Sequence, residues 1–165
     1  MGLLLAVQLR GTVNVPEPAG RTLRELRLGT RFRASLLPDT PSHRGMLSRV
    51  RNYVAWTPVG SELLRKLLAT RARKANGQPL QNVDLGPLGF RDLDHFVEAL
   101  MSEKVRYTQV PGLKPSFALS PPRGGFKRST RLAARAGGVL GENPSLGPLV
   151  ERMLPAVQNG RTRRA

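Results

Sequence analysis

Asp39 and His43 have the side-chain types of a catalytic acid–base pair. A spacing of four residues around the start of a helix can bring a carboxylate and an imidazole close together. No nucleophile or set of metal ligands accompanies them, and an active site needs such partners. We therefore expect no enzymatic activity, no small-molecule substrate and no cofactor. A measurable activity that is lost in His43→Ala would be needed to support an enzyme.

A second possible chemistry in the same stretch is the binding of an anion at a helix start. Residues 38–42 (PDTPS) have the composition of a turn, and Ser42 is a suitable N-cap for the helix that follows. His43 and Arg44 then lie beside the free N–H groups of the first turn, where phosphate is the obvious ligand. An ordinary amphipathic helix with a solvated basic face remains the alternative.

The charge of the chain indicates the kind of partner. Its 165 residues include 27 Lys and Arg against 11 Asp and Glu, which gives a formal charge of +16 and a pI near 11.8. Twenty-two of the basic residues are arginine, whose planar guanidinium suits phosphate. So large a charge repels itself in a compact chain unless a polyanion neutralises it, so nucleic acid is the leading partner. The absence of cysteine excludes disulfides, thiolate zinc sites and cysteine nucleophiles.

Hydrophobic periodicity predicts the elements that position these residues within the first 60. Residues 3–10 form a first strand, residues 31–37 alternate like a half-buried strand, and residues 54–56 form a short third strand. One helix is expected between Pro18 and Gly29, and a second from Ser42 to about residue 53. The order β-α-β-α-β, with crossovers of this length, predicts one small sheet with both helices on one face.

Residues 61–118 are predicted to form a helical extension that packs on this core. Ser61 caps a helix that ends in Arg71, Arg73 and Lys74, where the helix dipole favours cations. Residues 76–89 have the Gly-rich, polar composition of a loop. Residues 91–103 carry the most regular apolar stripe of the chain, with Phe96 and Leu100 among its members. Two amphipathic helices joined by an irregular loop follow from this pattern.

The last part, residues 119–165, is the most basic, with a formal charge of +7 against +6 for residues 1–60 and +3 for residues 61–118. From Tyr107 to Gly138 the chain has no useful period and is predicted to be irregular. Within residues 121–128 (PPRGGFKR), a chain without side chains at Gly124 and Gly125 can approach an RNA backbone closely. We expect residues 119–143 to be disordered without RNA, because they carry little apolar surface. A helix from about Pro144 to Leu154 and a mobile tail should follow. A disordered basic tail that binds polyanions nonspecifically is the alternative.

Neither a membrane segment nor a signal peptide is expected. Gln8 and Arg10 interrupt the apolar run at residues 1–7, and no basic region precedes that run. No other stretch approaches the roughly 20 apolar residues that cross a bilayer.

Five short blocks of sequence, in order, resemble the universal large-subunit ribosomal protein L-thirty family in its longer, archaeal type. The match extends from the first strand to about Leu154, whereas the bacterial form resembles only the first 60 residues or so. The blocks are residues 10–16 (RGTVNVP), 38–47 (PDTPSHRGML), 53–56 (YVAW), 111–115 (PGLKP) and 121–127 (PPRGGFK).

The resemblance implies a ferredoxin-like α+β core in residues 1–60, with a helical segment in residues 61–118 and an extended basic segment in residues 119–165. It implies a structural constituent of the large ribosomal subunit, located in the cytoplasm, with no catalytic activity. The implied partners are large-subunit rRNA, near the 5S rRNA, and neighbouring ribosomal proteins.

Basic residues and glycines at the helix start, in the strands and in the basic C-terminal segment are our candidates for RNA contact. The chain has only eight aromatic residues, which argues against a binder that stacks single-stranded bases. A nonspecific DNA- or RNA-compacting protein remains the alternative, since charge alone does not distinguish polyanions. The candidates are Arg10, Arg31, Arg33, His43, Arg44, Arg49, Arg51, Arg123, Gly124, Gly125, Lys127, Arg128, Arg131 and Arg135.

Overall fold

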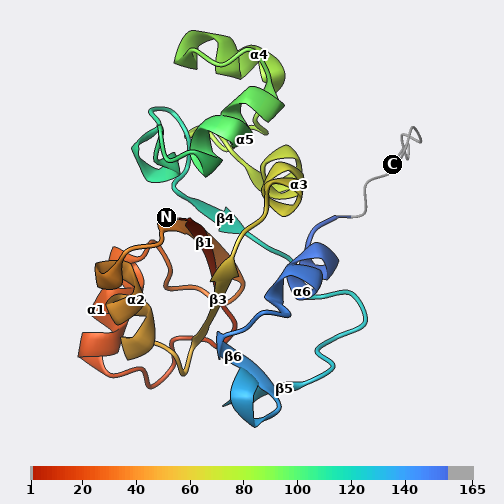
Figure 1. The fold of residues 1–165 in the computed structure, drawn as a ribbon. Helices are drawn as coiled ribbons and strands as arrows, with labels where there is room; N and C mark the ends of the chain where they lie inside the picture. Colours follow the sequence, from red (N-terminus) through yellow and green to blue (C-terminus); the bar gives the residue numbers. More distant parts are fainter. Residues whose placement is uncertain (1, 156–165) are drawn as a thin grey trace.

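The structure is a computed structural model that describes residues 2–155, in which a sheet of six strands has helices on both faces (Figure 1). The strands are β1 (Leu3–Gln8), β2 (Arg33–Pro38), β3 (Val54–Pro58), β4 (Ser116–Ala118), β5 (Ser129–Ala133) and β6 (Gly138–Glu142). The helices are α1 (Glu17–Glu25), α2 (Pro41–Arg49), α3 (Ser61–Arg71), α4 (Asn82–Leu85), α5 (Leu93–Met101) and α6 (Leu146–Met153). Short 3₁₀ helices occupy Gly86–Leu88, Tyr107–Gln109 and Ala134–Ala136.

The strands lie in the order β4-β2-β1-β3-β6-β5. β1 is central and antiparallel to both neighbours, with Leu5 opposite Leu36 of β2 and Thr57 of β3. β4 extends the sheet beyond β2, while β6 pairs in parallel with β3 and β5 in parallel with β6. The centre of the sheet therefore comes from the first 58 residues, and both of its edges come from residues after 115.

Each face of the sheet has its own hydrophobic core. On one face, Leu4 and Ala6 of β1 pack with Leu23 of α1 and Leu47 of α2. On the other face, Leu5 belongs to a larger cluster that takes in side chains of α3, α5 and α6. Fully burying a leucine side chain is worth roughly 1.5–3 kcal/mol, so the two clusters hold the helices against the sheet.

The predicted α+β class and the ferredoxin-like β-α-β-α-β core are confirmed, with α1 and α2 together on one face of the sheet (Figure 1). The predicted stripe of α5 is also confirmed, because Phe96 and Leu100 are buried there. α6 forms within the predicted range and buries Leu149 and Val150. Regular apolar spacing was a sufficient signal for each of these elements.

The prediction of a half-buried strand at residues 31–37 was wrong in two respects. β2 begins only at Arg33, because Phe32 has φ = 65°, a left-handed conformation that a bulky residue rarely adopts. In addition, Ala34, Ser35, Leu36 and Leu37 are all buried. The helices that follow residue 60 cover the second face, and a local pattern of alternation does not reveal such coverage.

The predicted loop at residues 76–89 and the predicted irregular chain from residue 107 onward were wrong in part. Gln81 and Asp84 form a capping box that starts the short helix α4. Three strands, β4, β5 and β6, lie in the segment predicted to be irregular. They are three to five residues long, which is too little for a recognisable alternation, and β6 also contains Gly138 and Gly141.

The division into residues 1–60, 61–118 and 119–165 stays a prediction, and the sheet takes strands from all three. Disorder of residues 119–143 without RNA also stays a prediction, although Val139 and Leu140 of β6 are buried in the structure. The predicted mobile tail lies outside the described residues.

Candidate nucleic-acid interface

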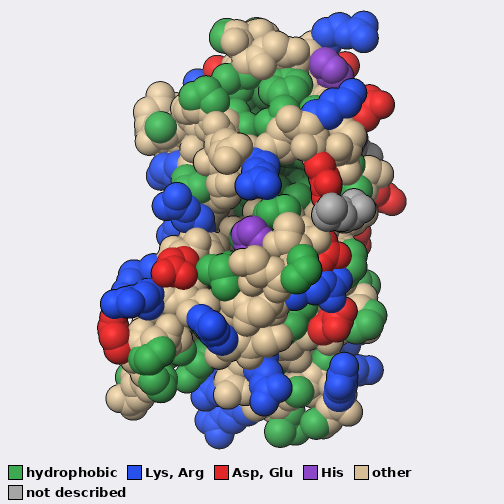
Figure 2. All heavy atoms as spheres, turned by 60° about the vertical axis from the view of Figure 1, so that its left-hand side comes forward, with side chains coloured by type: hydrophobic (Ala, Val, Ile, Leu, Met, Phe, Trp, Pro, Cys, Tyr) green, Lys and Arg blue, Asp and Glu red, His purple; other side chains and the backbone are tan. Residues whose placement is uncertain are grey.

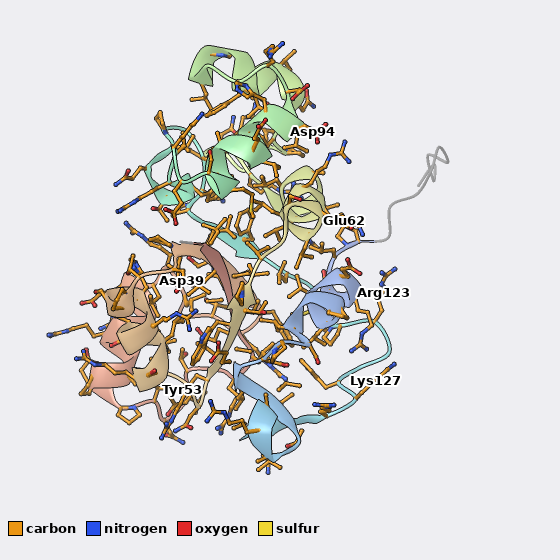
Figure 3. All side chains as sticks on the ribbon, viewed as in Figure 1. Asp39, Tyr53, Glu62, Asp94, Arg123 and Lys127 are labelled. Carbon is orange, nitrogen blue, oxygen red and sulfur yellow. The ribbon has the colours of Figure 1, made fainter. Side chains whose placement is uncertain are left out.

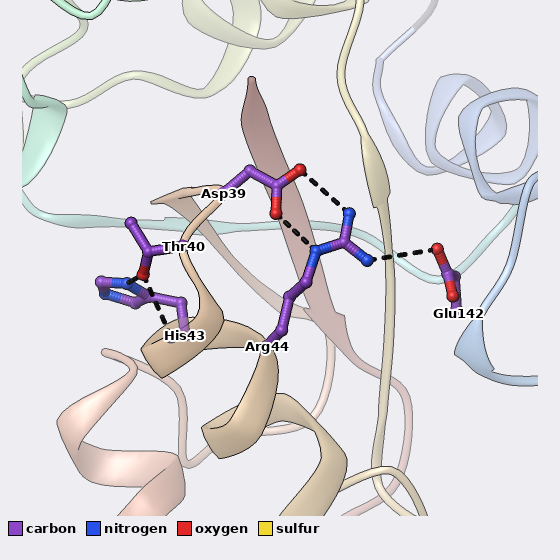
Figure 4. Close-up of polar contacts among 5 residues, drawn as sticks. All are labelled: Asp39, Thr40, His43, Arg44 and Glu142. Carbon is purple, nitrogen blue, oxygen red and sulfur yellow. Dashed lines mark hydrogen bonds and ion pairs between the residues drawn. The ribbon is translucent and has the colours of Figure 1, made fainter. Parts of the chain in front are cut away.

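The start of α2 differs in detail from the sequence prediction. Its N-cap is Thr40 rather than Ser42, because Pro41 takes the first helical position, where a missing N–H costs nothing. The Thr40 hydroxyl accepts a hydrogen bond from the His43 N–H at 3.2 Å and lies 2.7 Å from His43 Nδ1 (Figure 4). Burial, and secondarily the charge of Arg106, lowers the pKa of His43, so its imidazole is neutral near pH 7.

Arg44 is already paired within the protein. Its Nε and one terminal nitrogen donate to the two carboxylate oxygens of Asp39 at 2.5 and 2.9 Å, and another nitrogen lies 3.6 Å from Glu142 of β6 (Figure 4). The hydrogen bond from Arg44 lowers the pKa of Asp39, and the same bond raises the pKa of Arg44. Asp39 and His43 thus have separate partners and do not form an acid–base pair.

The end of α2 offers a different environment, which we call the α2-end hollow. It has a volume of about 450 Å³ and is lined by Arg51, beyond the helix, and by Arg131 and Arg135 from β5 and the 3₁₀ turn after it. These three side chains belong to exposed residues and have no acidic partner within 4 Å among residues 2–155. Glu142 also borders the hollow but lies beside Arg44. The fold therefore brings together three predicted residues from two distant segments.

The loop between β4 and β5 carries five more of the predicted residues. Figure 3 shows Arg123 and Lys127 on this loop, beside α6. Arg152 of α6 donates to the carbonyl oxygens of Arg123 at 3.2 Å and Gly125 at 2.8 Å, and so holds the loop. Gly124 and Gly125 have φ of 78° and 71°, which glycine adopts without strain. Lys127 and Arg128 line a hollow of about 210 Å³ together with Arg152.

The remaining predicted residues do not line either of these two hollows. Arg10 lies over the ring of Tyr53, with 5.7 Å between its guanidinium carbon and the ring centroid, and Arg31 lies over Phe32 at 4.6 Å. Arg33 donates to the Ser116 hydroxyl of β4 at 2.9 Å. Arg49 is an exposed residue in the last turn of α2. The fourteen candidates thus form several small groups rather than one patch.

Four further cations lie beside the predicted residues but were not among the candidates taken from the sequence. Arg152 has the two contacts with the loop described above, and Arg71, Arg73 and Lys114 surround a hollow near Arg33. Arg71 and Arg73 were attributed to the favourable placement of cations at the end of a helix. The Lys114 N–H donates to the Arg73 carbonyl at 2.9 Å, so the chain returns at Lys114 to the end of α3. The grouping of Lys114 with Arg71 and Arg73 is apparent only from this contact.

Surface charge is widely distributed on the face shown in Figure 2. Lys and Arg side chains are numerous in its lower half, at the level of α1 and α2, and acidic side chains lie among them. Within residues 2–155, no group of three or more His, Asp or Glu is arranged to hold a metal ion. No helix in this part of the chain has the length and apolar character needed to span a bilayer.

These features define a small, basic α+β protein whose surface hollows are lined by arginine. The sequence pattern described as "Ribosomal protein L30p/L7e" matches residues 4–54. Over 153 residues the chain is 37% identical to "Large ribosomal subunit protein uL30" of Cenarchaeum symbiosum, covering 93% of this chain and 99% of that protein. It is 36% identical to the uL30 protein of Nitrosopumilus maritimus (92% and 97% covered) and 37% identical to that of Thermofilum pendens (93% and 100%).

The chain therefore belongs to the ribosomal protein L30p/L7e family, and the resemblance to archaeal members is confirmed. Members of this family are structural, non-enzymatic components of the large ribosomal subunit, a cytoplasmic particle. This assignment gives the chain a structural role in that subunit. It also confirms the prediction that the protein is not an enzyme.

Proposed function

We propose that the chain binds large-subunit rRNA near the 5S rRNA, mainly through phosphate contacts, and stabilises the folded RNA there. Neighbouring ribosomal proteins are proposed as further partners. Contacts with phosphate fix the position of a protein on its RNA without reading the sequence. A formal charge of +16 attracts the RNA. The packed sheet fixes the relative positions of the segments that carry the basic residues.

The observation that carries this proposal is the α2-end hollow. Arg51, Arg131 and Arg135 converge there without acidic partners among the described residues. Three guanidinium groups that share a concave surface repel one another, and phosphate oxygens would relieve that repulsion through charge-assisted hydrogen bonds. Solubility requires surface charge but not its convergence, so it does not explain why arginines from distant segments share one concave surface.

Sedimentation of a cell extract through a sucrose gradient tests the assembly. We expect the chain to travel with large subunits at low salt and to leave them progressively at high salt. A chain that stays at the top of the gradient at every salt concentration would contradict the proposal. Crosslinking in intact subunits, followed by sequencing of the attached RNA, tests proximity to the 5S rRNA, which requires crosslinks in or beside that RNA.

A matched pair of variants tests the role of the hollow. The α2-end variant replaces Arg51, Arg131 and Arg135 with Gln. The control variant replaces Arg24, Arg65 and Lys66 with Gln, which removes the same charge from residues already paired with Glu17, Asp94 and Glu62. Loss of three phosphate contacts should lower the slope of log affinity against log salt by roughly two to three, while the control keeps nearly the full slope. Equal losses in the two variants would contradict a specific role for the hollow.

The alternative, a protein that compacts DNA or RNA nonspecifically, predicts a different result when duplex DNA and rRNA compete for the chain. Such a protein binds duplex DNA and rRNA similarly at equal salt, because both present regularly spaced phosphates. A structural rRNA protein should prefer folded large-subunit rRNA, since its cations match one arrangement of phosphates. Preference for the duplex would favour compaction.

A further inference from the structure

A second group of cations lies at the opposite edge of the sheet, in what we call the β4-edge hollow. Arg33 of β2, Arg71 at the end of α3, Arg73 just beyond it and Lys114 before β4 line this hollow, together with Ser116. The sheet order puts β4 at one edge and β5 at the other. The β4-edge hollow and the α2-end hollow are therefore separate places on the molecule.

Contacts among distant segments fix the position of the four cations. The Lys114 N–H donates to the Arg73 carbonyl at 2.9 Å, which ties the residues after α3 to the approach of β4. Arg33 donates to the Ser116 hydroxyl at 2.9 Å, and Arg71 donates to the Ser120 hydroxyl at 2.5 Å. Backbone pairing of β2 with β4 completes the frame. The fold therefore sets the backbone positions of the four cations, and hydroxyl groups hold the side chains of Arg33 and Arg71.

The charge of this group is not balanced within the described part of the chain. None of the four cations has a carboxylate within 4 Å among residues 2–155. Arg71 Nε is buried without a hydrogen-bond partner, a state that costs free energy. Burial, and secondarily the charge of Arg73, lowers the pKa of Arg71. An anion in the hollow would oppose both effects.

The size of the hollow restricts the ligand. Its volume is about 130 Å³, whereas sites for drug-sized molecules or cofactors measure roughly 300–1,000 Å³. A nucleoside would not fit, but a single tetrahedral oxyanion would. The Ser116 hydroxyl can also contribute a hydrogen bond, because hydroxyl groups both donate and accept.

We propose that the β4-edge hollow binds one phosphate group of an RNA backbone, separate from the phosphates bound at the α2-end hollow. Five steps between neighbouring strands separate β4 from β5, which is on the order of 24 Å across the sheet. The protein would then hold two separate stretches of RNA at a fixed distance. This inference rests on the proposed function, since it adds a second RNA contact to the first.

Two arms of one experiment identify the source of the phosphate. The β4-edge variant replaces Arg71, Arg73 and Lys114 with Gln, and its control is the Arg24, Arg65 and Lys66 variant, which loses the same residue types. In the first arm, affinity for extracted large-subunit rRNA is measured against salt, and the slope should fall by roughly two to three in the β4-edge variant alone. In the second arm, inorganic phosphate at constant ionic strength should raise the Tm of the wild-type chain more than that of the variant.

Each combination of results has a definite meaning. If the wild-type chain binds rRNA and the α2-end variant loses slope, but the β4-edge variant retains it, the second contact is wrong and the proposed function stands. If inorganic phosphate binds but the RNA slope is unchanged, the hollow is a site for a free anion and the RNA contact is overturned. If the wild-type chain fails to bind rRNA, the proposed function itself fails.

A conservative variant guards against misfolding. Arg71→Lys with Arg73→Lys keeps the charge and should restore most of the salt slope, although lysine lacks the bidentate geometry of arginine. Far-UV circular dichroism and thermal unfolding of each variant should match the wild-type chain. A charge-preserving variant that folds normally and still lacks the slope would overturn phosphate neutralisation as the role of these residues.

Discussion

The two ends of α2 place similar side chains in opposite situations. At the start, Arg44 is held by Asp39 and faces Glu142, so its charge is balanced inside the protein. Beyond the end, Arg51 faces Arg131 and Arg135 across the α2-end hollow. Both arginines lie on the same short stretch of sequence. The comparison teaches that the number of cations in a segment does not reveal which of them is available to a partner.

The substitution with the largest expected effect displaces β5, which forms one side of the α2-end hollow. A Cβ atom at Gly138 would overlap the Leu132 carbonyl group, so Gly138→Ala should force β5 away from β6. Overpacking of this kind costs about 1–3 kcal/mol in the free energy of unfolding, to be measured by urea denaturation. RNA affinity should fall as well, because Arg131 and Arg135 move.

Gly45→Ala in α2 is the matched control for this change. Apart from α2 itself, no atom lies within 4 Å of a Cβ at that position, and alanine is the better helix former, so stability should rise slightly. Similar unfolding curves for Gly138→Ala and the wild-type chain would show that the close approach is not needed.

Single substitutions at the two ends of α2 should then differ in their effect on RNA binding. Arg51→Gln should reduce rRNA affinity by roughly tenfold at moderate salt and lower the salt slope by about one, as expected for one lost phosphate contact. Arg44→Gln should lower the Tm, because it leaves Asp39 without its partner, but should change RNA affinity little. Filter binding and thermal unfolding measure the two effects. An equal loss of affinity in both variants would contradict the comparison.

Amide hydrogen exchange sharpens the contrast between the two strands that carry the hollow. All residues of β5 are exposed or only half-buried, whereas Val139 and Leu140 of β6 are buried. We expect rapid exchange through residues 119–133 of the free protein, slower exchange in β6, and added protection of β5 when rRNA is bound. Strong protection of β5 without RNA would show that the hollow is rigid before binding.

Releasing Arg44 from Asp39 should free its guanidinium group to bind an RNA phosphate. Asp39→Asn removes the carboxylate that holds the guanidinium, while the amide keeps nearly the same shape. We expect a small increase in RNA affinity, about threefold or less, with a salt slope that is steeper by up to about one. A parallel measurement on Glu17→Gln, which releases Arg24 on α1, shows how much of the gain comes from net charge alone. No difference between the two variants would indicate that position is unimportant.

The smallest expected effect concerns pH. The pKa of His43 is lowered in the folded protein, so near pH 6 the unfolded chain binds more protons than the folded one. Stability should therefore decline as pH falls through about 6.5, the ordinary pKa of histidine. In His43→Gln this part of the decline should be absent. Thermal unfolding at pH 7.5 and pH 5.5 provides the comparison, and identical shifts in both proteins would contradict it.

Local signals predicted the centre of the molecule well. Apolar spacing identified the β-α-β-α-β core and the helices α5 and α6, since each buries one regular stripe or strand face. The edges of the sheet were not predictable in this way. β4, β5 and β6 are short, and their pairing depends on neighbours far away in the sequence.

The candidate site followed the same rule. The sequence indicated arginines with affinity for phosphate, including Arg51 and Arg131, but not which would converge. Arg44 was predicted to bind phosphate, but its main partner is Asp39, five residues earlier, for which the sequence had suggested His43 as the partner. Arg71 and Arg73 were overlooked because a basic helix end already has a local explanation. Contacts within the fold, and not residue type, separate the paired cations from the available ones.

The central position of β1 bears on how the chain is made. Its two partners, β2 and β3, are both complete by residue 58, so the middle of the sheet can close while the rest of the polypeptide is still being synthesised. Contacts between residues close in sequence form faster than those that must wait for distant segments. Both edge strands, with Lys114 before β4 and Arg131 in β5, would be added last to this preformed centre.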